Sequence, residues 1–336
     1  MSSLIPFSLL ELASVREGDT VSRTLANSVA YARHGESLGF RRFWLAEHHN
    51  MEGITSSATS VLIGHIAGKT ETIRVGSGGV MLPNHPPLVI AEQFGTLECL
   101  YPGRIDLGLG RAPGTDPITS RALRRDGIGA EQFPRDVAQL QALLGPLQPG
   151  QRVKAIPGAG TNVPIWLLGS SLYSAQLAAM NGLPYAFAGH FAPGLYREAL
   201  RIYRDQFQPG ATMDQPYAML ALPAVPADTT EEARFLTTTS YQRILALFRG
   251  QPLWMKPPVE SMNGLWTPQE EAGIRDFLGL QVLGDEDRIH QQLTELLATV
   301  EVDELMFTVD LYDPAKRRHG LDILARVRDR LAVEAA

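Results

Sequence analysis

Two adjacent histidines, His48 and His49, directly follow the predicted strand 42–47, which ends in Glu47. Neighbouring residues of a strand point to opposite sides, so only one of the two imidazoles is expected to face a site at the strand's carboxyl end. This alternation argues against a metal ion bound by the pair. A single imidazole there could act as an acid or a base near neutral pH. The alternative is that both histidines simply pack at the end of a strand.

A serine-rich turn runs from Gly169 to Ser174, between an apolar run and a helical pattern. The first turn of a helix has backbone N–H groups without partners and the positive end of the helix dipole, so it favours anions such as phosphate. Ser170, Ser171 and Ser174 add hydroxyl donors. The alternative is that a serine merely caps the helix.

Arg111 ends the run 105–111, in which Gly108 and Gly110 leave room for a ligand to approach. Its guanidinium offers a bidentate fork for phosphate. Strands four and five are neighbours in a barrel, so Arg111 and the serine-rich turn would converge. The usual phosphate site of such barrels follows strands seven and eight, and this arrangement departs from it. A surface arginine without a ligand is the alternative.

Two adjacent glycines, Gly78 and Gly79, stand near the end of the run 73–80. They permit backbone geometry that is closed to other residues, and they would let a flat ring system lie against the main chain. A tight loop with no ligand would use them equally well.

These motifs follow short apolar runs that alternate with longer helical patterns, which is typical of a parallel α/β sheet or barrel. Most runs are apolar at consecutive positions, as expected for strands covered on both faces. The predicted strands, whose number is that of a (β/α)8 TIM barrel, are residues 7–12, 42–47, 73–80, 105–111, 164–170, 185–189, 217–225 and 304–310. The predicted helices are residues 22–38, 57–69, 89–100, 135–144, 174–181, 194–206, 230–249, 285–299 and 315–332.

Two long segments interrupt this repeat. Residues 113–163 follow strand four, and residues 251–282 follow strand seven. Both are expected to project from the face that holds the carboxyl ends of the strands, where the active sites of such barrels lie. We expect one domain, residues 1–336. A doubly wound sheet is the main rival, but the glycines at 108, 110 and 114 miss the G-x-G-x-x-G spacing by one residue.

Composition excludes several classes of protein. A formal net charge of −6 leaves no basic surplus for a phosphate backbone, so nucleic-acid binding is not expected. No stretch reaches about 18 uninterrupted apolar residues, so we expect no membrane span and a cytoplasmic location. Cys99 is the sole cysteine, which excludes an internal disulfide. Its apolar surroundings predict a buried, inert thiol.

In their order along the chain, these motifs resemble the bacterial luciferase-like monooxygenase family, in particular its FMN-dependent branch. The resemblance covers nearly the whole chain and is carried by residues 6–11, 43–49, 77–83, 101–111, 166–171 and 184–189. It implies the same barrel fold, with His48 as the catalytic histidine near the reactive edge of a flavin. It also implies that residues 251–282 form a lid over the substrate. It implies a non-prolyl cis peptide bond at Gly78–Gly79 under the flavin ring. The positions implied to bind the cofactor are Gly78, Gly79, Arg111, Ser170, Ser171 and Ser174, and no metal ligand is implied.

The resemblance further implies a monooxygenase that uses reduced FMN and O2 to oxidise a small organic substrate, with the reduced flavin supplied by a separate reductase. Three alternatives remain. A deazaflavin could serve hydride transfer on the same barrel, or the protein could bind flavin without turnover. A metal-dependent hydrolase barrel is the third, but its His-x-His on strand one is missing.

The helices predicted over 57–69 and 89–100 are apolar over more than the stripe that faces a barrel. Val61, Ile66, Phe94 and Leu97 are among these apolar residues. The extra apolar surface predicts a homodimer with a two-fold interface on these helices, and the family resemblance implies the same. The alternative is that these residues pack on the barrel of their own chain.

Overall fold

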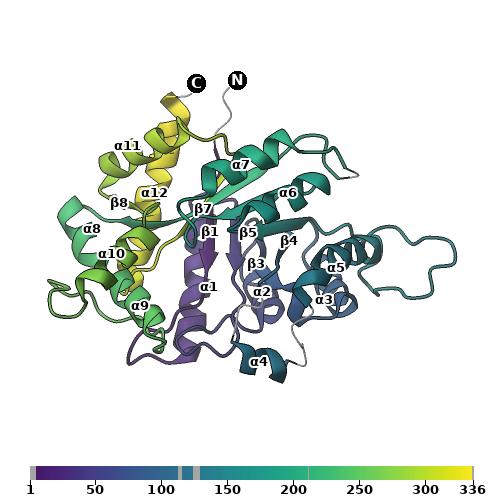
Figure 1. Ribbon diagram of the computed structural model, residues 1–336, viewed down its shortest axis with the longest axis horizontal. Helices are drawn as coiled ribbons and strands as arrows, with labels where there is room; N and C mark the ends of the chain where they lie inside the picture. Colours follow the sequence, from purple (N-terminus) through teal and green to yellow (C-terminus); the bar gives the residue numbers. More distant parts are fainter. Residues whose placement is uncertain (1–4, 113–115, 124–128, 211, 335–336) are drawn as a thin grey trace.

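The computed structural model describes residues 5–112, 116–123, 129–210 and 212–334. At its centre is a closed barrel of eight parallel strands (Figure 1). The last barrel strand pairs with the first, and the sixth pairs with the seventh, so the ring has no free edge. The barrel strands are β1 (Phe7–Glu11), β2 (Arg42–Leu45), β3 (Arg74–Met81), β4 (Ile105–Gly110), β5 (Ile165–Gly169), β6 (Tyr185–Ala188), β7 (Ala218–Pro226) and β9 (Glu304–Thr308). The predicted fold class is confirmed, and each predicted strand overlaps one of these.

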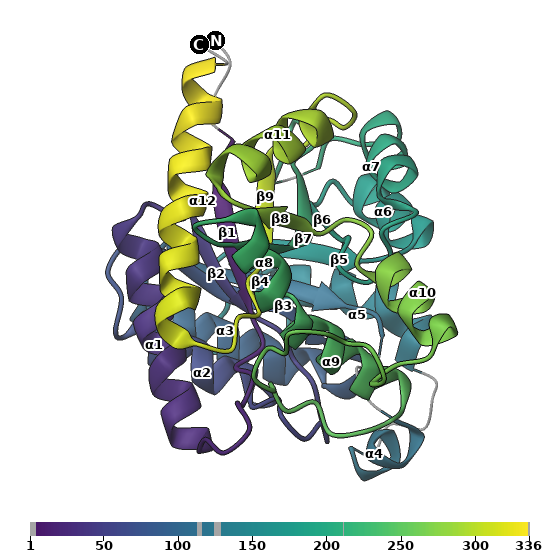
Figure 2. The same cartoon turned by 90° about the vertical axis from the view of Figure 1, so that its left-hand side faces the viewer.

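Helices surround the barrel, and α12 lies beside α1 although they come from opposite ends of the chain (Figure 2). The helices before β7 are α1 (Val21–Ser37), α2 (Thr59–Ala67), the short 3₁₀ helix η1 (Leu82–Asn84), α3 (Pro87–Leu100), α4 (Pro117–Ala122), α5 (Gly129–Leu144), α6 (Leu172–Met180) and α7 (Tyr196–Asp205). Those after β7 are α8 (Thr230–Leu236), α9 (Thr238–Phe248), α10 (Pro268–Phe277), α11 (Glu286–Leu297) and α12 (Pro314–Glu334). No helix in the described ranges is both long and apolar enough to cross a membrane.

The connection from β7 to β9 differs from the sequence prediction. A single helix was expected over 230–249, but α8 and α9 meet at Thr237. Three consecutive β-branched threonines, 237–239, weaken helix propensity at this point. The Thr238 hydroxyl also donates to the carbonyl of Phe235 at 2.6 Å. Further along, β8 (Val282–Gly284), which the sequence did not predict, pairs in parallel with the end of β7.

The segment 113–163 contains α4, α5 and a long loop; residues 113–115 and 124–128 lie outside the described residues. A Cβ atom added to Gly95 of α3 would lie 2.1 Å from the Cα atom of Gly158. The loop after α5 therefore packs directly on α3, along the outside of the barrel. The expectation that the whole segment projects from the carboxyl face is wrong for this part.

The barrel interior holds a buried ionic network as well as apolar side chains. Arg42 donates to Asp106 at 2.7 Å and to Glu304 at 3.0 Å, and Arg74 also reaches Asp106 at 2.6 Å. Burial alone would raise the pKa of Asp106, but the two guanidinium groups hold it below its usual range. Breaking such a network would leave a buried charge without its partner, which costs about 3–5 kcal/mol. These residues therefore contribute to the stability of the barrel.

The outer surface of α2 and α3 is less apolar than the sequence suggested. Ile66, Phe94 and Leu97 are buried within their own chain, whereas Val61 is 68% exposed. Most of the apolar positions are therefore explained by packing on the barrel, and the dimer stays a prediction. Cys99 is exposed on α3, so the prediction of a buried thiol is wrong. It lies on the outward side of α3, whose inward side carries Phe94.

Candidate functional site at the barrel mouth

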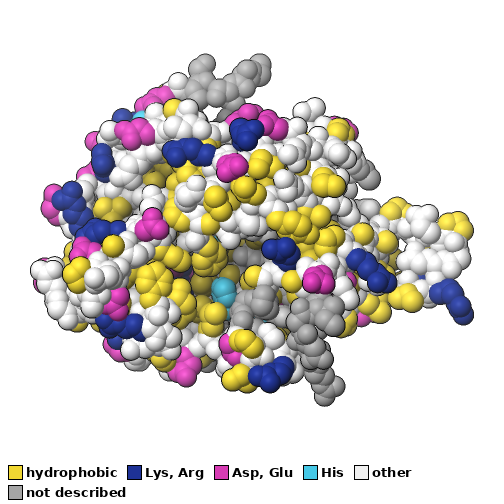
Figure 3. Space-filling model, in the orientation of Figure 1, with side chains coloured by type: hydrophobic (Ala, Val, Ile, Leu, Met, Phe, Trp, Pro, Cys, Tyr) yellow, Lys and Arg dark blue, Asp and Glu magenta, His cyan; other side chains and the backbone are white. Residues whose placement is uncertain are grey.

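A cavity of about 880 Å³, counted to its open mouth, lies at the carboxyl ends of the strands. Its lining comes from the segments that follow β1, β2 and β6, from β7 and β9, and from α9 and the segment before β8. Figure 3 shows a hollow on this face, with hydrophobic side chains around it and a histidine inside it. The carboxyl end of the strands is where the active sites of (β/α)8 barrels lie.

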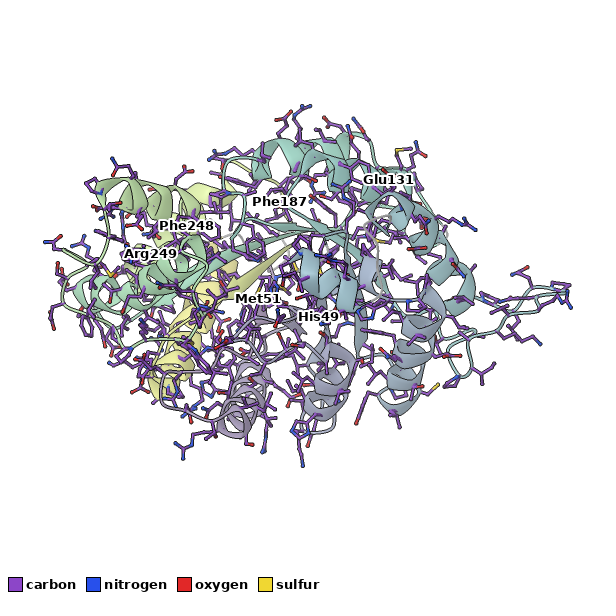
Figure 4. The ribbon with its side chains drawn as sticks, turned by 60° about the horizontal axis from the view of Figure 1, so that its bottom comes forward. His49, Met51, Glu131, Phe187, Phe248 and Arg249 are labelled. Carbon is purple, nitrogen blue, oxygen red and sulfur yellow. The ribbon has the colours of Figure 1, made fainter. Side chains whose placement is uncertain are left out.

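His48 lines this cavity, on the segment that follows β2. His49 instead lies 3.0 Å, through its Nε2 atom, from the carboxylate of Glu47. The two imidazoles thus have different surroundings, as the sequence predicts, although β2 itself ends at Leu45. Figure 4 shows His49 and Met51 on the same segment, at the mouth of the barrel.

Glu47 joins two strand ends. Its Oε1 atom is bonded to the Nε2 atoms of His49 at 3.0 Å and of His85 at 2.7 Å, and it accepts from the backbone N–H of Met81 at 3.3 Å. Burial alone would raise the pKa of Glu47, but the hydrogen bonds from the two histidines hold it below its usual value. The segments after β2 and β3 are therefore tied together by one buried carboxylate.

Ligand atoms of Glu47, His49 and His85 all lie within 4.8 Å of one another, a donor set that could hold a metal ion. The sequence had not connected them, because His85 comes from the segment after β3. The signal was available: a histidine close behind the end of the strand next to β2 must reach the same rim. In the structure, hydrogen bonds to the carboxylate hold both imidazoles.

The peptide bond between Gly78 and Gly79 is cis, as the resemblance implied. A Cβ atom on Gly78 would lie 2.6 Å from Leu10, and one on Gly79 would lie 2.8 Å from the carbonyl oxygen of Gly108. The register between β3 and β4 also shifts between Ser77 and Val80. Close packing inside the barrel therefore requires both glycines, whether or not a ring lies against them.

Arg111 and the serine-rich turn do converge. The guanidinium of Arg111, at the end of β4, stacks on the ring of Tyr173 with its Cζ atom 4.3 Å from the ring centroid. Tyr173 belongs to the first turn of α6, and Ser171 is the N-cap residue of that helix. A positive charge and the amino end of a helix are thus side by side, which is an arrangement that suits a phosphate.

The serines of this turn differ in what their hydroxyl groups do. Ser171 makes no side-chain capping bond, so its hydroxyl is not used on its own helix. The Ser174 hydroxyl donates to the carbonyl of Ser171 at 2.7 Å and lies 3.0 Å from the hydroxyl of Tyr185. Ser170 is partly buried between the strand and the helix. Among the three, the hydroxyl of Ser171 is the best candidate to hydrogen-bond to a ligand at the start of α6.

Several polar residues of the cavity were missed by sequence reasoning. Arg243 of α9 donates to Asp310 at 2.8 Å, and His190 follows β6. Burial lowers the pKa of His190 to about 4, with a contribution from nearby His48, although Asp310 acts in the opposite direction. His190 is therefore neutral at physiological pH. These residues lie far apart in the sequence, and no local pattern links them.

The chain is similar in sequence to known proteins. Residues 5–300 match the luciferase-like monooxygenase family. The chain is 50% identical over 321 residues to the uncharacterized protein YvbT of Bacillus subtilis, which covers 95% of this chain and 96% of that protein. It is 48% identical over 328 residues to a luciferase-like monooxygenase of Escherichia coli, and the match covers 97% of this chain and 98% of that protein.

Solved structures share the same barrel. The apo form of MsnO8 superimposes with a TM-score of 0.86 at 34% identity, covering 97% of this chain and 98% of that one. Two further structures show the fold alone, at 15% identity. One is the FMN complex of a type II Baeyer–Villiger monooxygenase component from Pseudomonas putida (TM-score 0.72, 96% and 97% covered). The other is a coenzyme F420-dependent tetrahydromethanopterin reductase from Methanopyrus kandleri (TM-score 0.68, 98% and 100% covered). With its barrel, its mouth cavity and the match over residues 5–300, the chain belongs to the luciferase-like monooxygenase family.

Proposed function

We propose that this protein is a flavin-dependent monooxygenase that uses reduced FMN and O2 to oxidise a small organic substrate, with the reduced FMN supplied by a separate reductase. One observation carries the proposal: His48 stands in the wall of a largely apolar cavity at the barrel mouth. An apolar, partly enclosed cavity suits oxidation of an organic molecule, because it keeps out the water that would divert the reaction.

The candidate cofactor residues follow one another around the rim. β2, β3, β4 and β5 are neighbours in the ring, and Leu45 of β2 lies opposite Ser77 of β3. His48, Arg111 and the start of α6 follow the ends of β2, β4 and β5, and the Gly78–Gly79 peptide lies in the second half of β3. Three strand spacings span about 14 Å. That span suits an extended ligand with a ring at one end and a phosphate at the other.

The residues present fit FMN. Arg111 and the first turn of α6 would hold its phosphate, with Ser171 as a hydroxyl donor and Ser170 and Ser174 alongside. The backbone at Gly78 and Gly79 would support its ring. Bound in reduced form, FMN would supply the electrons that activate O2. The segment 251–282, which contributes Leu253 and Phe277 to the cavity wall, would act as the lid over the substrate.

His48 would act at the ring end of this site, by hydrogen bonding to the reacting oxygen or by moving a proton. We expect His48→Ala to bind FMN as the wild type does, while coupled product falls about 100-fold or more and released hydrogen peroxide rises. Peroxide would rise because O2 is still reduced while its oxygen no longer reaches the substrate.

The test measures oxygen uptake with reduced FMN across aldehydes, ketones and polycyclic aromatics, above the rate of free reduced FMN. His319→Ala, on the outer helix α12, is the matched control and should leave product and peroxide unchanged. Unchanged coupling in His48→Ala would remove His48 from the mechanism. Uptake that never exceeds the free-flavin rate would indicate a flavin-binding protein without turnover. Tighter binding of coenzyme F420 than of FMN would refute the choice of cofactor.

A further inference from the structure

The mouth cavity is lined mostly by apolar side chains, with a few polar ones among them. The apolar wall is formed by side chains from the segment after β2, from α9, and from the connection between α9 and β8, namely Met51, Ile54, Ile244, Leu247, Leu253 and Phe277. The polar residues besides His48 include His190, Arg243, Gln281 and Asp310, and we call these four the polar lining. A ligand that fills the space must therefore present carbon over most of its surface and few polar groups.

Gln281 is a residue of the polar lining whose side-chain amide is only partly hydrogen-bonded. Its Oε1 atom accepts from the Thr237 hydroxyl at 3.2 Å, which sets the orientation of the amide. Its Nε2 atom is buried and has no hydrogen-bond partner among the described residues. A buried amide nitrogen without a partner is unfavourable, so a ligand acceptor placed there would recover that loss. The structure thus contains a donor that is held in place and unused.

The other three residues of the polar lining carry no net charge together. Arg243 and Asp310 form an ion pair at 2.8 Å, so their charges compensate each other. His190 is neutral, because burial lowers its pKa to about 4. The Nδ1 atom of His190 is buried without a partner among the described residues, and the ring is hydrogen-bonded to the backbone of Ala221. With its one N–H used on Ala221, the neutral ring leaves Nδ1 as an acceptor.

We propose that the polar lining around Gln281 is the substrate subsite for a neutral hydrogen-bonding group, and that Gln281 is the residue that recognises it. The substrate is an apolar organic molecule that carries an amide, a ketone or a similar neutral acceptor. A carboxylate would bring an uncompensated negative charge into the cavity and would face the lone pair of His190. An ammonium group would find no free acceptor of opposite charge, since Asp310 is already paired with Arg243.

This inference rests on the proposed function, because oxidation requires that the substrate lie in the cavity that His48 lines. What distinguishes a substrate from other apolar molecules is then a neutral acceptor group. The apolar wall accepts any hydrocarbon chain of suitable size. Gln281 selects the substrate among such molecules by its polar group.

The test is ligand binding by calorimetry on the full-length protein, with and without oxidised FMN. Octanamide, octanoate and octylamine share one hydrocarbon chain, and the first two have nearly the same shape but differ in charge. We expect octanamide to bind at least tenfold more tightly than either charged ligand. Gln281→Leu should weaken octanamide binding about two- to tenfold, the worth of one hydrogen bond, and leave octanoate unchanged.

Gln206→Leu is the matched control, because Gln206 is exposed at the end of the outer helix α7 and does not line this cavity, and it should bind octanamide as the wild type does. Octanoate binding as tightly as octanamide would overturn the subsite. So would wild-type affinity in Gln281→Leu, or no octanamide binding by the wild type. These failures are distinct from a failure of the proposed function, which would appear as absent FMN binding or absent oxygen uptake while the preference for octanamide persists.

Discussion

Replacing Arg111 with alanine tests the cofactor phosphate site directly, because the side chain is exposed and its removal leaves no buried charge behind. The guanidinium is held beside the first turn of α6 by stacking on Tyr173, at 4.3 Å. A hydrogen bond to a charged group contributes about 1.5–3 kcal/mol. At about 1.4 kcal/mol for each tenfold change, the loss corresponds to FMN binding that is roughly 10- to 150-fold weaker.

The assay is quenching of flavin fluorescence, with FMN and riboflavin titrated in parallel. Riboflavin has the same ring without the phosphate, so Arg111→Ala should not change its affinity. Arg111→Lys keeps the charge but loses the planar fork, so its affinity for FMN should lie between those of the wild type and Arg111→Ala. Arg201→Ala, which removes an exposed arginine of α7, is the control and should bind both flavins normally. Wild-type FMN affinity in Arg111→Ala, or an equal loss for riboflavin, would show that the phosphate is not held here.

Two further predictions concern stability and assembly. Glu47→Gln should lower the free energy of unfolding by about 1–3 kcal/mol at pH 7, measured by urea denaturation. The pKa of Glu47 is depressed in the folded state, so its contribution exists above the ordinary value of 4.5 and is lost as the pH falls through the lower, folded value; an equal deficit at pH 3 would contradict this. The predicted homodimer should scatter light as twice 36.7 kDa. Val61→Asp on α2 should halve that mass, whereas Val153→Asp on the loop after α5 should not, and a wild-type mass of one chain would exclude the dimer.

The barrel could be predicted because its local signals agree. Strands covered on both faces are apolar at consecutive positions, and the helices between them keep a helical period. The errors arose where a local rule was incomplete. Thr237 lies within a plausible helical pattern, yet α8 and α9 meet there. An apolar neighbourhood suggested that Cys99 is buried, but its position on α3 faces outward.

The candidate site was predictable only in part, and the reason is the origin of its residues. His48, Arg111 and Ser171 each stand at the end of a strand in a recognisable local pattern, so the sequence singles them out. Arg243 and Gln281 have no such pattern. They reach the cavity because the connection after β7 folds over the barrel mouth, and its backbone is fixed there by bonds from Leu253 to Glu52 and from Met255 to Val15. Only the assembled fold brings them together.

The cluster around Glu47 shows how that fold positions a reactive side chain. Four-coordinate zinc with ligand bonds of about 2.1 Å would separate its ligand atoms by about 3.4 Å. The two imidazoles instead lie 2.7 and 3.0 Å from the carboxylate oxygen, which are hydrogen-bond lengths. A metal ion would have to lengthen both of these separations, and in the structure the hydrogen bonds hold the two histidines against Glu47 at the rim. Because His48 and His49 are adjacent in the chain, anchoring His49 to Glu47 on one side also fixes where His48 enters the cavity on the other.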